Sequence, residues 1–475
     1  MTPRIFMKKC TVPETVENLF AWHELPGALQ RLTPPWMGLK NIKKKGGIEP
    51  GASASMDMAS AFPKLPFYMT MEARHTAYEK NRLFRDRLIK GPFAQWDHTH
   101  TFSSLGRGLS ILEDRVEYAL PFHVPKGWMP LVERELNRLF DYRHRIMLAD
   151  IARHSKFHET IPPGKPLTIL ISGAGGPVGQ ALIPFLTTGG HRVIQLVRHP
   201  AGSQNQAGIT EIEWNPSKGE LNLDNPTGKN EKIDVVINLN GYNIGSGPWN
   251  RKTRELIINS RNFSTSLLAK SVMELPRERR PELFISASAT GFYGHRGDDI
   301  LDETNPWGDL FISKVCKGWE ECARPVEDAG IRTVFARMGV VLTPAGGALE
   351  RLSIPFLLGC GAKIGSGKQC MGWIGMDDLV YSLHHIIMER EIRGPINLVC
   401  PRPVTNQEFT EVLAGVLSRP AGFTIPEWLI KLIWGDMGKE VLLTSTRAVP
   451  AKLKASGFRF SYPELEEMLR HVLGK

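Results

Sequence analysis

The sequence has no apolar run of about 18 residues, the length that a membrane-spanning helix requires. Its N-terminus also lacks the apolar core of a secretory signal peptide. Cysteine is scarce, and none of the six forms a CxxC pair, so we expect reduced, buried thiols rather than disulfides. These absences predict a soluble cytoplasmic protein. The cysteines are Cys10, Cys316, Cys322, Cys360, Cys370 and Cys400.

Basic residues are in excess, with a formal net charge of +10, but they are scattered along the chain. The densest clusters, Lys43–Lys45 and Arg277–Arg280, contain no interleaved aromatic residues. We therefore interpret both as solvated loops and expect no nucleic-acid partner. The 475 residues suggest about three compact units, and 42% hydrophobic residues are enough for sizeable cores.

A glycine-rich turn organises the larger part of the chain. Thr168–Ile171 is a short run rich in β-branched residues, typical of a buried parallel strand. Gly173, Gly176 and Gly179 follow, and 178–186 has the apolar periodicity of a helix. Strand, glycine turn and helix in this order predict a dinucleotide site with the pyrophosphate at the helix N-terminus. The alternative interpretation is an ordinary turn between a strand and a helix.

Further apolar runs alternate with helical patterns along the rest of the chain. This alternation predicts an α/β fold with a doubly wound, mainly parallel sheet. Residues at the carboxyl ends of such strands face the ligand. The runs are Arg192–Val197, Val235–Leu239, Leu283–Ala287, Thr333–Val341 and Ile396–Val399.

Two of these strand ends bear on the choice of cofactor. Arg198 follows the strand 192–197, where an acidic residue would bind the ribose hydroxyls of NAD. An arginine there instead favours the 2′-phosphate of NADP, with a surface arginine as the alternative. Leu239, Asn240 and Gly241 follow another strand, where the backbone is expected to lie against the adenosine side of the cofactor.

The first 160 residues have a different pattern. Arg4–Lys9 predicts a strand, Pro13–Glu24 and Gly27–Leu32 predict short helices, and 39–121 is strand-like with glycine turns. Trp128–His154 predicts one long amphipathic helix. This order describes an α+β helix-grip unit. The expected core residues of the long helix are Leu131, Leu136, Leu139, Phe140 and Ile146.

This stretch resembles the START-like (SRPBCC, cyclase/dehydrase-like) superfamily. The resemblance implies a cavity for an apolar ligand between the sheet and the long helix. It is carried by Ala21–Glu24, Pro26–Ala28, Arg31–Trp36, Gly91–Phe93 and Trp96–His100.

His98 and His100 lie two residues apart, so on a strand their imidazoles share a face and could hold one metal ion. Spacing alone offers no third ligand. We therefore favour histidines that are hydrogen-bonded to neighbours in the sheet, and predict no metal site.

Residues 168–475 resemble an atypical extended short-chain dehydrogenase/reductase of the "epimerase family", also described as cell-division-inhibitor-like. The resemblance implies NADP contacts from the glycine loop (Gly173, Ala174, Gly176, Pro177, Val178, Gly179), Arg198, Leu239, Asn240, Gly241, Arg261 and Val341. Among the segments that carry it are Asn238–Gly241, Trp249-Asn250 to Ser260-Arg261, Ser286–Ala289, Trp319-Glu320, Arg337–Leu342, Gly346–Ala348, Gly365–Gln369, Trp373-Ile374 and Asp377–Leu379.

The resemblance also implies a domain order. We expect a START-like domain at 1–160, a linker at 161–166, an NADP-binding Rossmann domain at 167–345 and a C-terminal substrate lobe at 346–475. Departures from the family pattern, such as Asn240 in place of alanine and Gly375 in place of histidine, leave the small-molecule substrate undefined.

The tyrosine–lysine pair of the wider superfamily is missing. None of the eight tyrosines has a lysine four residues later, the spacing that places both on one helix face. Alignment on Glu320 puts Ile312 and Cys316 at the tyrosine and lysine positions. An unassisted tyrosine has a pKa near 10 and is a poor base at neutral pH.

Ser288 and Tyr293 remain as candidate catalytic residues. Ser288 directly follows the strand 283–287, at the position where the superfamily's substrate-orienting hydroxyl is found, and Tyr293 would act as an acid. The alternatives are a packed aromatic for Tyr293 and an exposed helix face for Ser313, Lys314 and Lys317. Two functions follow: an NADP-dependent oxidoreductase or epimerase-like enzyme with a fused apolar-ligand module, or a non-catalytic NADP-sensing regulator.

Overall fold

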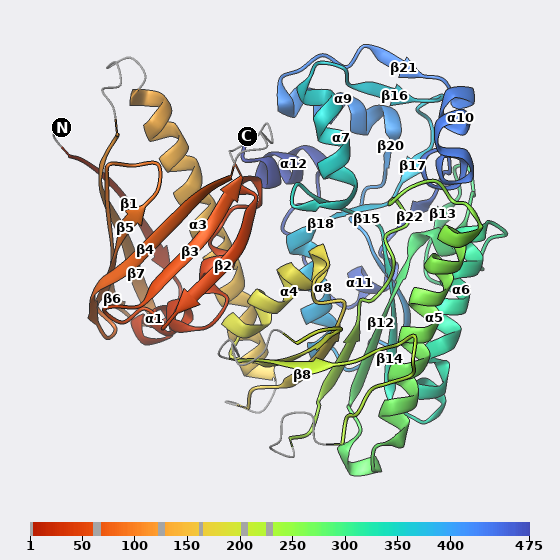
Figure 1. Cartoon of the computed structure of the whole chain (residues 1–475), viewed down its shortest axis with the longest axis horizontal. Helices are drawn as coiled ribbons and strands as arrows, with labels where there is room; N and C mark the ends of the chain where they lie inside the picture. Colours follow the sequence, from red (N-terminus) through yellow and green to blue (C-terminus); the bar gives the residue numbers. More distant parts are fainter. Residues whose placement is uncertain (1–2, 60–67, 122–128, 161–164, 201–207, 225–230) are drawn as a thin grey trace. The chain divides into compact units, whose positions relative to one another are not determined.

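The structure is a computed structural model and describes residues 3–59, 68–121, 129–160, 165–200, 208–224 and 231–475 (Figure 1). The chain forms two compact units. The first comprises Met1–Thr160 with Pro184–Gly190 and Val472–Gly474, and the second comprises Ile161–Ile183 with His191–His471 and Lys475.

The first unit is built on a seven-stranded antiparallel sheet in the order β1-β7-β6-β5-β4-β3-β2. Three short helices lie between β1 and β2 in the chain, and the long helix α3 follows β7. The order of elements matches the predicted one. The elements are β1 (Arg4–Val12), α1 (Val16–Glu24), α2 (Ala28–Arg31), η1 (Pro35–Met37), β2 (Leu39–Lys45), β3 (Ser53–Ala59), β4 (Tyr68–Glu79), β5 (Leu83–Lys90), β6 (Gln95–Gly106), β7 (Leu109–Ala119) and α3 (Met129–Thr160).

Helix α3 differs from the prediction at its end and on its core face. It continues past His154 to Thr160, because Phe157 is buried and extends the apolar stripe. It therefore ends directly before the segment predicted as a linker, of which 161–164 lies outside the described residues, as does Trp128. Leu131 was expected in the core but is 44% exposed, since it lies off the stripe that Leu136 and Phe140 form.

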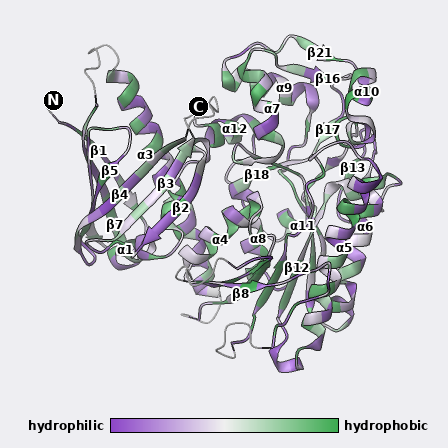
Figure 2. Cartoon of the chain, viewed as in Figure 1, coloured by the Kyte–Doolittle hydropathy of each residue, from purple (hydrophilic) through white to green (hydrophobic). Residues whose placement is uncertain are grey.

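The cluster Lys43–Lys45 lies on β2 rather than in a loop. Strand β2 is at one edge of the sheet and pairs only with β3 among the described strands. The three lysines are exposed, and β2 is largely purple in Figure 2. A polar edge strand accounts for the run of lysines that suggested a loop, because the outer side of such a strand is in contact with water.

The second unit is built on a seven-stranded parallel sheet in the order β10-β9-β8-β11-β12-β14-β19. Its central strands consist almost entirely of buried apolar residues, and β8 and β12 are mainly green in Figure 2. This confirms the predicted α/β fold with a parallel sheet. The strands are β8 (Thr168–Ser172), β9 (Arg192–Val197), β10 (Ile209–Glu213), β11 (Val235–Asn238), β12 (Leu283–Ala289), β14 (Arg332–Met338) and β19 (Gly394–Leu398).

The helices of this sheet follow its strands along the chain. They are α4 (Pro177–Thr188), α5 (Arg251–Glu274), α6 (Phe311–Asp328) and α8 (Met376–Met388), with short turns η3 (Arg277–Arg279) and η4 (Thr290–Tyr293). Helix α5 begins where the Asn250 side chain accepts a hydrogen bond from the Thr253 amide, which satisfies one of the free amides of the first turn.

The predicted strand 333–341 is two strands. Gly339 separates β14 from β15 (Val340–Thr343), and β15 pairs with β18 (Trp373–Gly375) outside the main sheet. A Cβ atom at Gly339 would lie 2.7 Å from the Gly372 carbonyl oxygen. This close approach turns the chain from the sheet into the C-terminal segment.

The C-terminal segment consists of short strands and helices. They are β13 (Ile300–Leu301), α7 (Gly347–Leu357), β16 (Ala362–Ile364), β17 (Cys370–Met371), β20 (Val404–Thr405), α9 (Asn406–Leu417), β21 (Phe423–Ile425), α10 (Glu427–Met437), η5 (Gly438–Leu442), β22 (Arg447–Ala448), α11 (Ala451–Ala455) and α12 (Leu465–Leu473), with β13 contributed from between η4 and α6.

All six cysteines are free thiols, as predicted. The expectation of burial is correct for Cys316, Cys370 and Cys400 but wrong for Cys360, which is exposed just after α7. Among the described residues, no helix combines the length and the apolar character needed to cross a bilayer.

Candidate functional site

The register of the parallel sheet defines one functional edge. Ser172 at the end of β8 pairs with Leu196 of β9 and with Asn238 of β11. The residues that directly follow these three strands therefore lie at the same edge of the sheet. They are the residues that the sequence predicts to hold a cofactor.

Gly173 turns the chain out of β8 with a φ of +73°, a conformation that favours glycine. A Cβ atom at this position would lie 2.7 Å from the Leu239 carbonyl carbon and 2.9 Å from the Asn240 nitrogen. Any side chain would therefore separate the turn after β8 from the turn after β11. The close approach of these two backbones brings the two turns into contact at this edge of the sheet.

Gly176 and Gly179 have different roles. The Gly176 amide donates to the Gly173 carbonyl at 3.0 Å, and a Cβ at Gly176 would meet only that oxygen, at 3.4 Å, so its outer side is open. A Cβ at Gly179 would lie 2.7 Å from the Cα of Ala174, so this glycine permits α4 to pack on the turn. Helix α4 begins at Pro177, and its first amides have no carbonyl partner within the helix.

Arg198 follows β9 and is exposed. In the part of the chain that the structure describes, its guanidinium has no hydrogen bond or ion pair. Arg192, at the opposite end of the same strand, is also exposed but is 2.6 Å from the Glu231 carboxylate. The arginine at the functional edge is therefore free to meet an anion.

Hydrogen bonds hold the turn after β11. Asn238 is fully buried, accepts from the Ser172 hydroxyl at 2.7 Å and donates to the Thr265 hydroxyl at 2.8 Å. The Asn240 side chain donates to the Ser260 carbonyl at 3.2 Å. These bonds connect the turn to β8 and to α5 and fix its backbone.

Arg261 on α5 supports the same turn from below. Its Nη1 donates to the carbonyls of Tyr242 and Ile257 at 3.1 and 3.0 Å, and its guanidinium lies 4.8 Å from the Trp319 ring centroid. A Cβ at Gly241 would lie 3.1 Å from its Cζ. Burial lowers the pKa of Arg261. The guanidinium of Arg261 therefore lies against the turn that follows β11.

Val341 is half-buried on β15, opposite Ile374 of β18. The turn that follows β15 approaches the start of α4, because a Cβ at Gly346 would lie 2.9 Å from the Pro177 Cγ. The predicted set thus gathers around the turns after β8, β9 and β11 and around this contact.

The candidate catalytic residues lie in a buried polar network. The Ser288 hydroxyl donates to Glu320 at 2.7 Å. Arg337 donates to both Glu320 oxygens at 2.9 and 3.0 Å, and its Nη1 donates to the Tyr293 oxygen at 3.1 Å. The Tyr293 hydroxyl donates to the Asn397 side-chain oxygen at 2.7 Å. The structure therefore brings Ser288 and Tyr293 together through Glu320 and Arg337.

Both candidate hydroxyls are inaccessible in this arrangement. Ser288 is 3% exposed and Tyr293 is 0% exposed. Burial raises the pKa of Tyr293 to about 12, although the charge of Arg337 opposes the shift. Their catalytic roles stay predictions, and each hydroxyl already has a protein partner.

Glu320, Arg337 and Asn397 are the members of this network to which the sequence assigned no role. The available signal was a charge within an apolar strand, since Arg337 interrupts the run 333–341. A charged side chain is rarely buried without a partner. That rule predicts a buried acid nearby, but it does not identify Glu320.

The exposure of residues on α6 differs in part from the expectation. Lys314 is exposed, as expected, and Lys317 lies 3.5 Å from Glu321, so neither contacts Tyr293. Ser313 was expected on the exposed face but is fully buried, and its hydroxyl donates to the Gly291 carbonyl at 2.9 Å. The short turn η4 covers this part of the helix, which single-helix periodicity does not reveal.

Ile312 and Cys316, at the positions of the missing pair, are buried in an apolar cluster. Burial raises the pKa of the Cys316 thiol to about 12. Neither side chain can exchange a proton at neutral pH.

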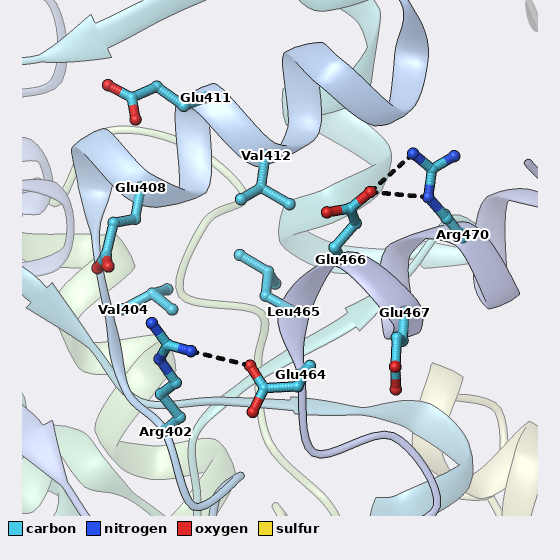
Figure 3. Close-up of a pocket in the computed structure, with 10 residues that line it drawn as sticks. All are labelled: Arg402, Val404, Glu408, Glu411, Val412, Glu464, Leu465, Glu466, Glu467 and Arg470. Atoms are coloured by element: carbon cyan, nitrogen blue, oxygen red, sulfur yellow. Dashed lines mark hydrogen bonds and ion pairs between the residues drawn. The ribbon is translucent and has the colours of Figure 1, made fainter.

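A separate pocket of about 570 Å³ lies between α9 and α12 (Figure 3). Two ion pairs cross its wall, Arg402–Glu464 at 3.1 Å and Arg470–Glu466 at 2.7 Å. It shares no residue with the functional edge. It is lined by Arg402, Val404, Glu408, Glu411, Val412, Glu464, Leu465, Glu466, Glu467 and Arg470.

Comparison with protein families gives two matches. Residues 169–398 match the model of the NAD dependent epimerase/dehydratase family. Residues 425–472 match a domain of unknown function, DUF1731. The first match begins within β8 and ends at the last residue of β19, so it spans the sheet that carries the functional edge.

Bacterial and human relatives each align with about two-thirds of the chain. The epimerase family protein Mb2239 of Mycobacterium bovis is 36% identical over 305 residues, which cover 64% of this chain and 97% of that protein. Human epimerase family protein SDR39U1 is 32% identical over 310 residues, with 65% and 100% coverage.

Two solved structures extend the comparison. The nucleoside-diphosphate sugar epimerase from Corynebacterium glutamicum has a TM-score of 0.77 and 31% identity, and the match covers 99% of this chain and 90% of that chain. Human SDR39U1 (isoform 2) with NADPH has a TM-score of 0.58 and 30% identity, with 65% and 99% coverage. The first match therefore includes the N-terminal unit.

The burial of Tyr293 predicts a loss of stability at high pH. The unfolded chain releases a phenol proton near pH 10, whereas the native state holds it up to a pKa of about 12. Between these values the unfolded state binds fewer protons, so stability falls as the pH rises. We expect this group to lower the free energy of unfolding by about 3 kcal/mol, measured by urea denaturation at each pH. Tyr293→Phe should lack this part of the slope, and an equal slope in both proteins would contradict the prediction.

Proposed function

The chain belongs to the epimerase family of extended short-chain dehydrogenases/reductases, and on this premise we propose that it is an NADP-binding oxidoreductase or epimerase-like protein that acts on a small molecule. The observation that carries the proposal is Gly173. Its bare Cα, at a φ of +73°, brings the turns after β8 and β11 together shortly before the first turn of α4. Free amides at a helix N-terminus attract phosphate.

The residues present fit NADP. The open side of Gly176 and the first amides of α4 would receive the pyrophosphate. The guanidinium of Arg198, which has no partner among the described residues, would meet the 2′-phosphate. In the same proposal, 239–241 would contact the adenosine side, with Arg261 holding that turn and Val341 at the far wall. The human relative was solved with NADPH, which supports the assignment.

NADP supplies the hydride chemistry, and the protein positions and shields it. Ser288 and Tyr293 are the proposed catalytic hydroxyls. Glu320 and Asn397 hold them, so a substrate must exchange those hydrogen bonds before either hydroxyl reaches a reacting atom. The proposed substrate lobe is 346–475, beside a Rossmann domain at 167–345.

Apolar side chains at the positions of the missing tyrosine–lysine pair favour a second function. Buried Ile312 and Cys316 cannot assist a tyrosine, and Tyr293 is sealed in the network. A protein that binds NADP without turnover would use the cofactor state to control the docking of a partner. This regulator keeps the whole cofactor site and needs no proton-transfer group.

The N-terminal unit is proposed to be a START-like module that binds an apolar ligand. The support is the order of its elements, with two short helices after β1 and the long helix α3 after an antiparallel sheet. A fused module of this kind would deliver or sequester the substrate of the second unit.

The role of Arg198 can be tested by cofactor affinity. A charge-assisted hydrogen bond contributes about 1.5–3 kcal/mol, or about ten- to a hundredfold in affinity. Arg198→Ala should weaken NADPH binding by that factor and leave NADH binding nearly unchanged, as measured by calorimetry. Arg192→Ala is the matched control, since it removes an exposed arginine from the other end of β9 and should change neither affinity. Equal losses for both cofactors in Arg198→Ala would refute the 2′-phosphate role.

Hydride transfer separates the enzyme from the regulator. The purified chain is incubated with NADPH tritiated at the nicotinamide C4 and with cell extract, and heat-denatured protein serves as the control. An enzyme transfers label to a product that the control lacks. If NADPH binds tightly but label never leaves the cofactor, the chain performs no net reduction, which favours the regulator over the oxidoreductase.

Apolar-ligand binding can be tested with a fluorescent fatty acid. The full chain should bind it saturably, and an unlabelled fatty acid should displace it. Leu131→Gln removes an exposed leucine from α3 and should leave the affinity unchanged, because the proposed ligand lies inside the unit. Binding that is not saturable, or that the variant abolishes, would show adsorption to the surface instead.

A further inference from the structure

His98 and His100 on β6 are buried on the same face of the N-terminal sheet. The register places Asp86 of β5 directly opposite His98 and Asp114 of β7 directly opposite His100. Two carboxylates thus flank the pair, one from each neighbouring strand. Spacing along the sequence cannot reveal this arrangement, because each carboxylate comes from another strand.

Asp114 fixes the orientation of both imidazoles. One of its oxygens lies 2.9 Å from His98 Nε2 and 2.8 Å from His100 Nδ1. Its other oxygen lies 2.7 Å from the Nε2 of His144 on α3. His98 and His144 form hydrogen bonds with this carboxylate, and His100 Nδ1 lies beside the oxygen that His98 contacts. The prediction that these histidines are hydrogen-bonded to neighbours is confirmed for His98.

The remaining ring nitrogens both face Asp86. His98 Nδ1 and His100 Nε2 lie 3.6 and 3.8 Å from the same Asp86 oxygen. When His98 Nε2 and His100 Nδ1 carry their protons on the Asp114 side, the two nitrogens that face Asp86 present lone pairs. Two lone pairs and a carboxylate oxygen are all acceptors, and an electron-poor centre between them would satisfy all three.

We propose that Asp86, His98 and His100 bind a divalent transition-metal ion in the N-terminal unit. Their three ligand atoms lie within 4.8 Å of one another. Metal–ligand bonds of about 2.0–2.1 Å in a tetrahedral site set ligand atoms about 3.3–3.4 Å apart, so the two distances from Asp86 to the imidazoles, 3.6 and 3.8 Å, need to contract by only a few tenths of an ångström. Two imidazoles and one carboxylate are a ligand set for zinc or iron(II).

Asp114 and His144 complete the site without touching the ion. A metal-binding histidine usually donates its other ring nitrogen to a carboxylate, which fixes the tautomer and strengthens the ligand. Here one carboxylate does this for both histidines, and His144 holds it in place. Arg143, on the same helix, interacts electrostatically with Asp86 and Asp114. Two carboxylates and this guanidinium leave one net negative charge, which favours a cation between the ligands.

Three protein ligands leave at least one coordination position for water or another molecule. The Asp86 side chain is 19% exposed, whereas both imidazoles are nearly sealed, so the ion is reached from the Asp86 side. The metal site lies wholly within the first unit and does not depend on the proposed NADP function.

Metal titration of the full chain tests the proposal. The protein is stripped with a chelator and titrated with Zn²⁺ by calorimetry and with Co²⁺ by visible absorption, which reports the ligand geometry. We expect one site per chain whose Co²⁺ spectrum indicates nitrogen and oxygen ligands. Asp86→Asn keeps the shape of the side chain but removes its charge and should weaken binding by at least about tenfold.

Asp97→Asn is the matched control. Asp97 neighbours His98 on β6 but bonds Arg87 at 2.6 Å on the other face of the sheet, so this variant should bind metal as the wild type does. Circular dichroism shows that each variant is folded. The proposal is overturned if the wild type binds no Zn²⁺, which would mean that a shared proton lies between the three groups. It is also overturned if Asp86→Asn and wild type bind with equal affinity, since the ion would then occupy an unrelated surface site.

Discussion

The approach of the β8–α4 turn to the end of β11 determines how the second unit can work. A side chain at Gly173 would push against the Leu239 carbonyl, and the two turns would separate. Their contact is possible because the parallel register ends β8 and β11 at the same level, while Ser172 and Asn238 join them by a buried hydrogen bond. The exposed helix amides, Arg198 and the turn after β11 all face one edge as a result. This contact between the two turns is made by the backbone, so it does not depend on the chemistry of the substrate.

The buried network is the second structural determinant of this unit. The Glu320–Arg337 pair connects α6 to β14, and Ser288 and Tyr293 connect it to β12 and η4. A buried ion pair adds little net stability, but loss of one member leaves a costly unpaired charge. The network therefore restricts movement of the strands where a substrate would bind. The hydroxyls of Ser288 and Tyr293 are buried and hydrogen-bonded to protein groups. This arrangement is compatible both with an enzyme whose site must open and with a regulator.

The sequence was informative where the chemistry is local. The glycine turn, the strand ends and the order of the helix-grip elements follow from residues close together in the chain, and the family comparisons support the parallel α/β part. It was uninformative where the partner comes from elsewhere. Leu131 and Ser313 were misassigned because burial depends on what covers a helix face. Asp86 and Glu320 were not identified as partners because strand register and helix packing bring them to His98 and Ser288.

The lysines of β2 have a consequence for the solution behaviour of the protein. An edge strand offers unpaired backbone groups to which a second chain can add. Lys43–Lys45 place a run of like charges along this edge. Two such edges would repel each other before their backbones could join, which disfavours intermolecular strand addition and fibril growth. The charges that suggested a solvated loop thus disfavour the pairing of two β2 edges.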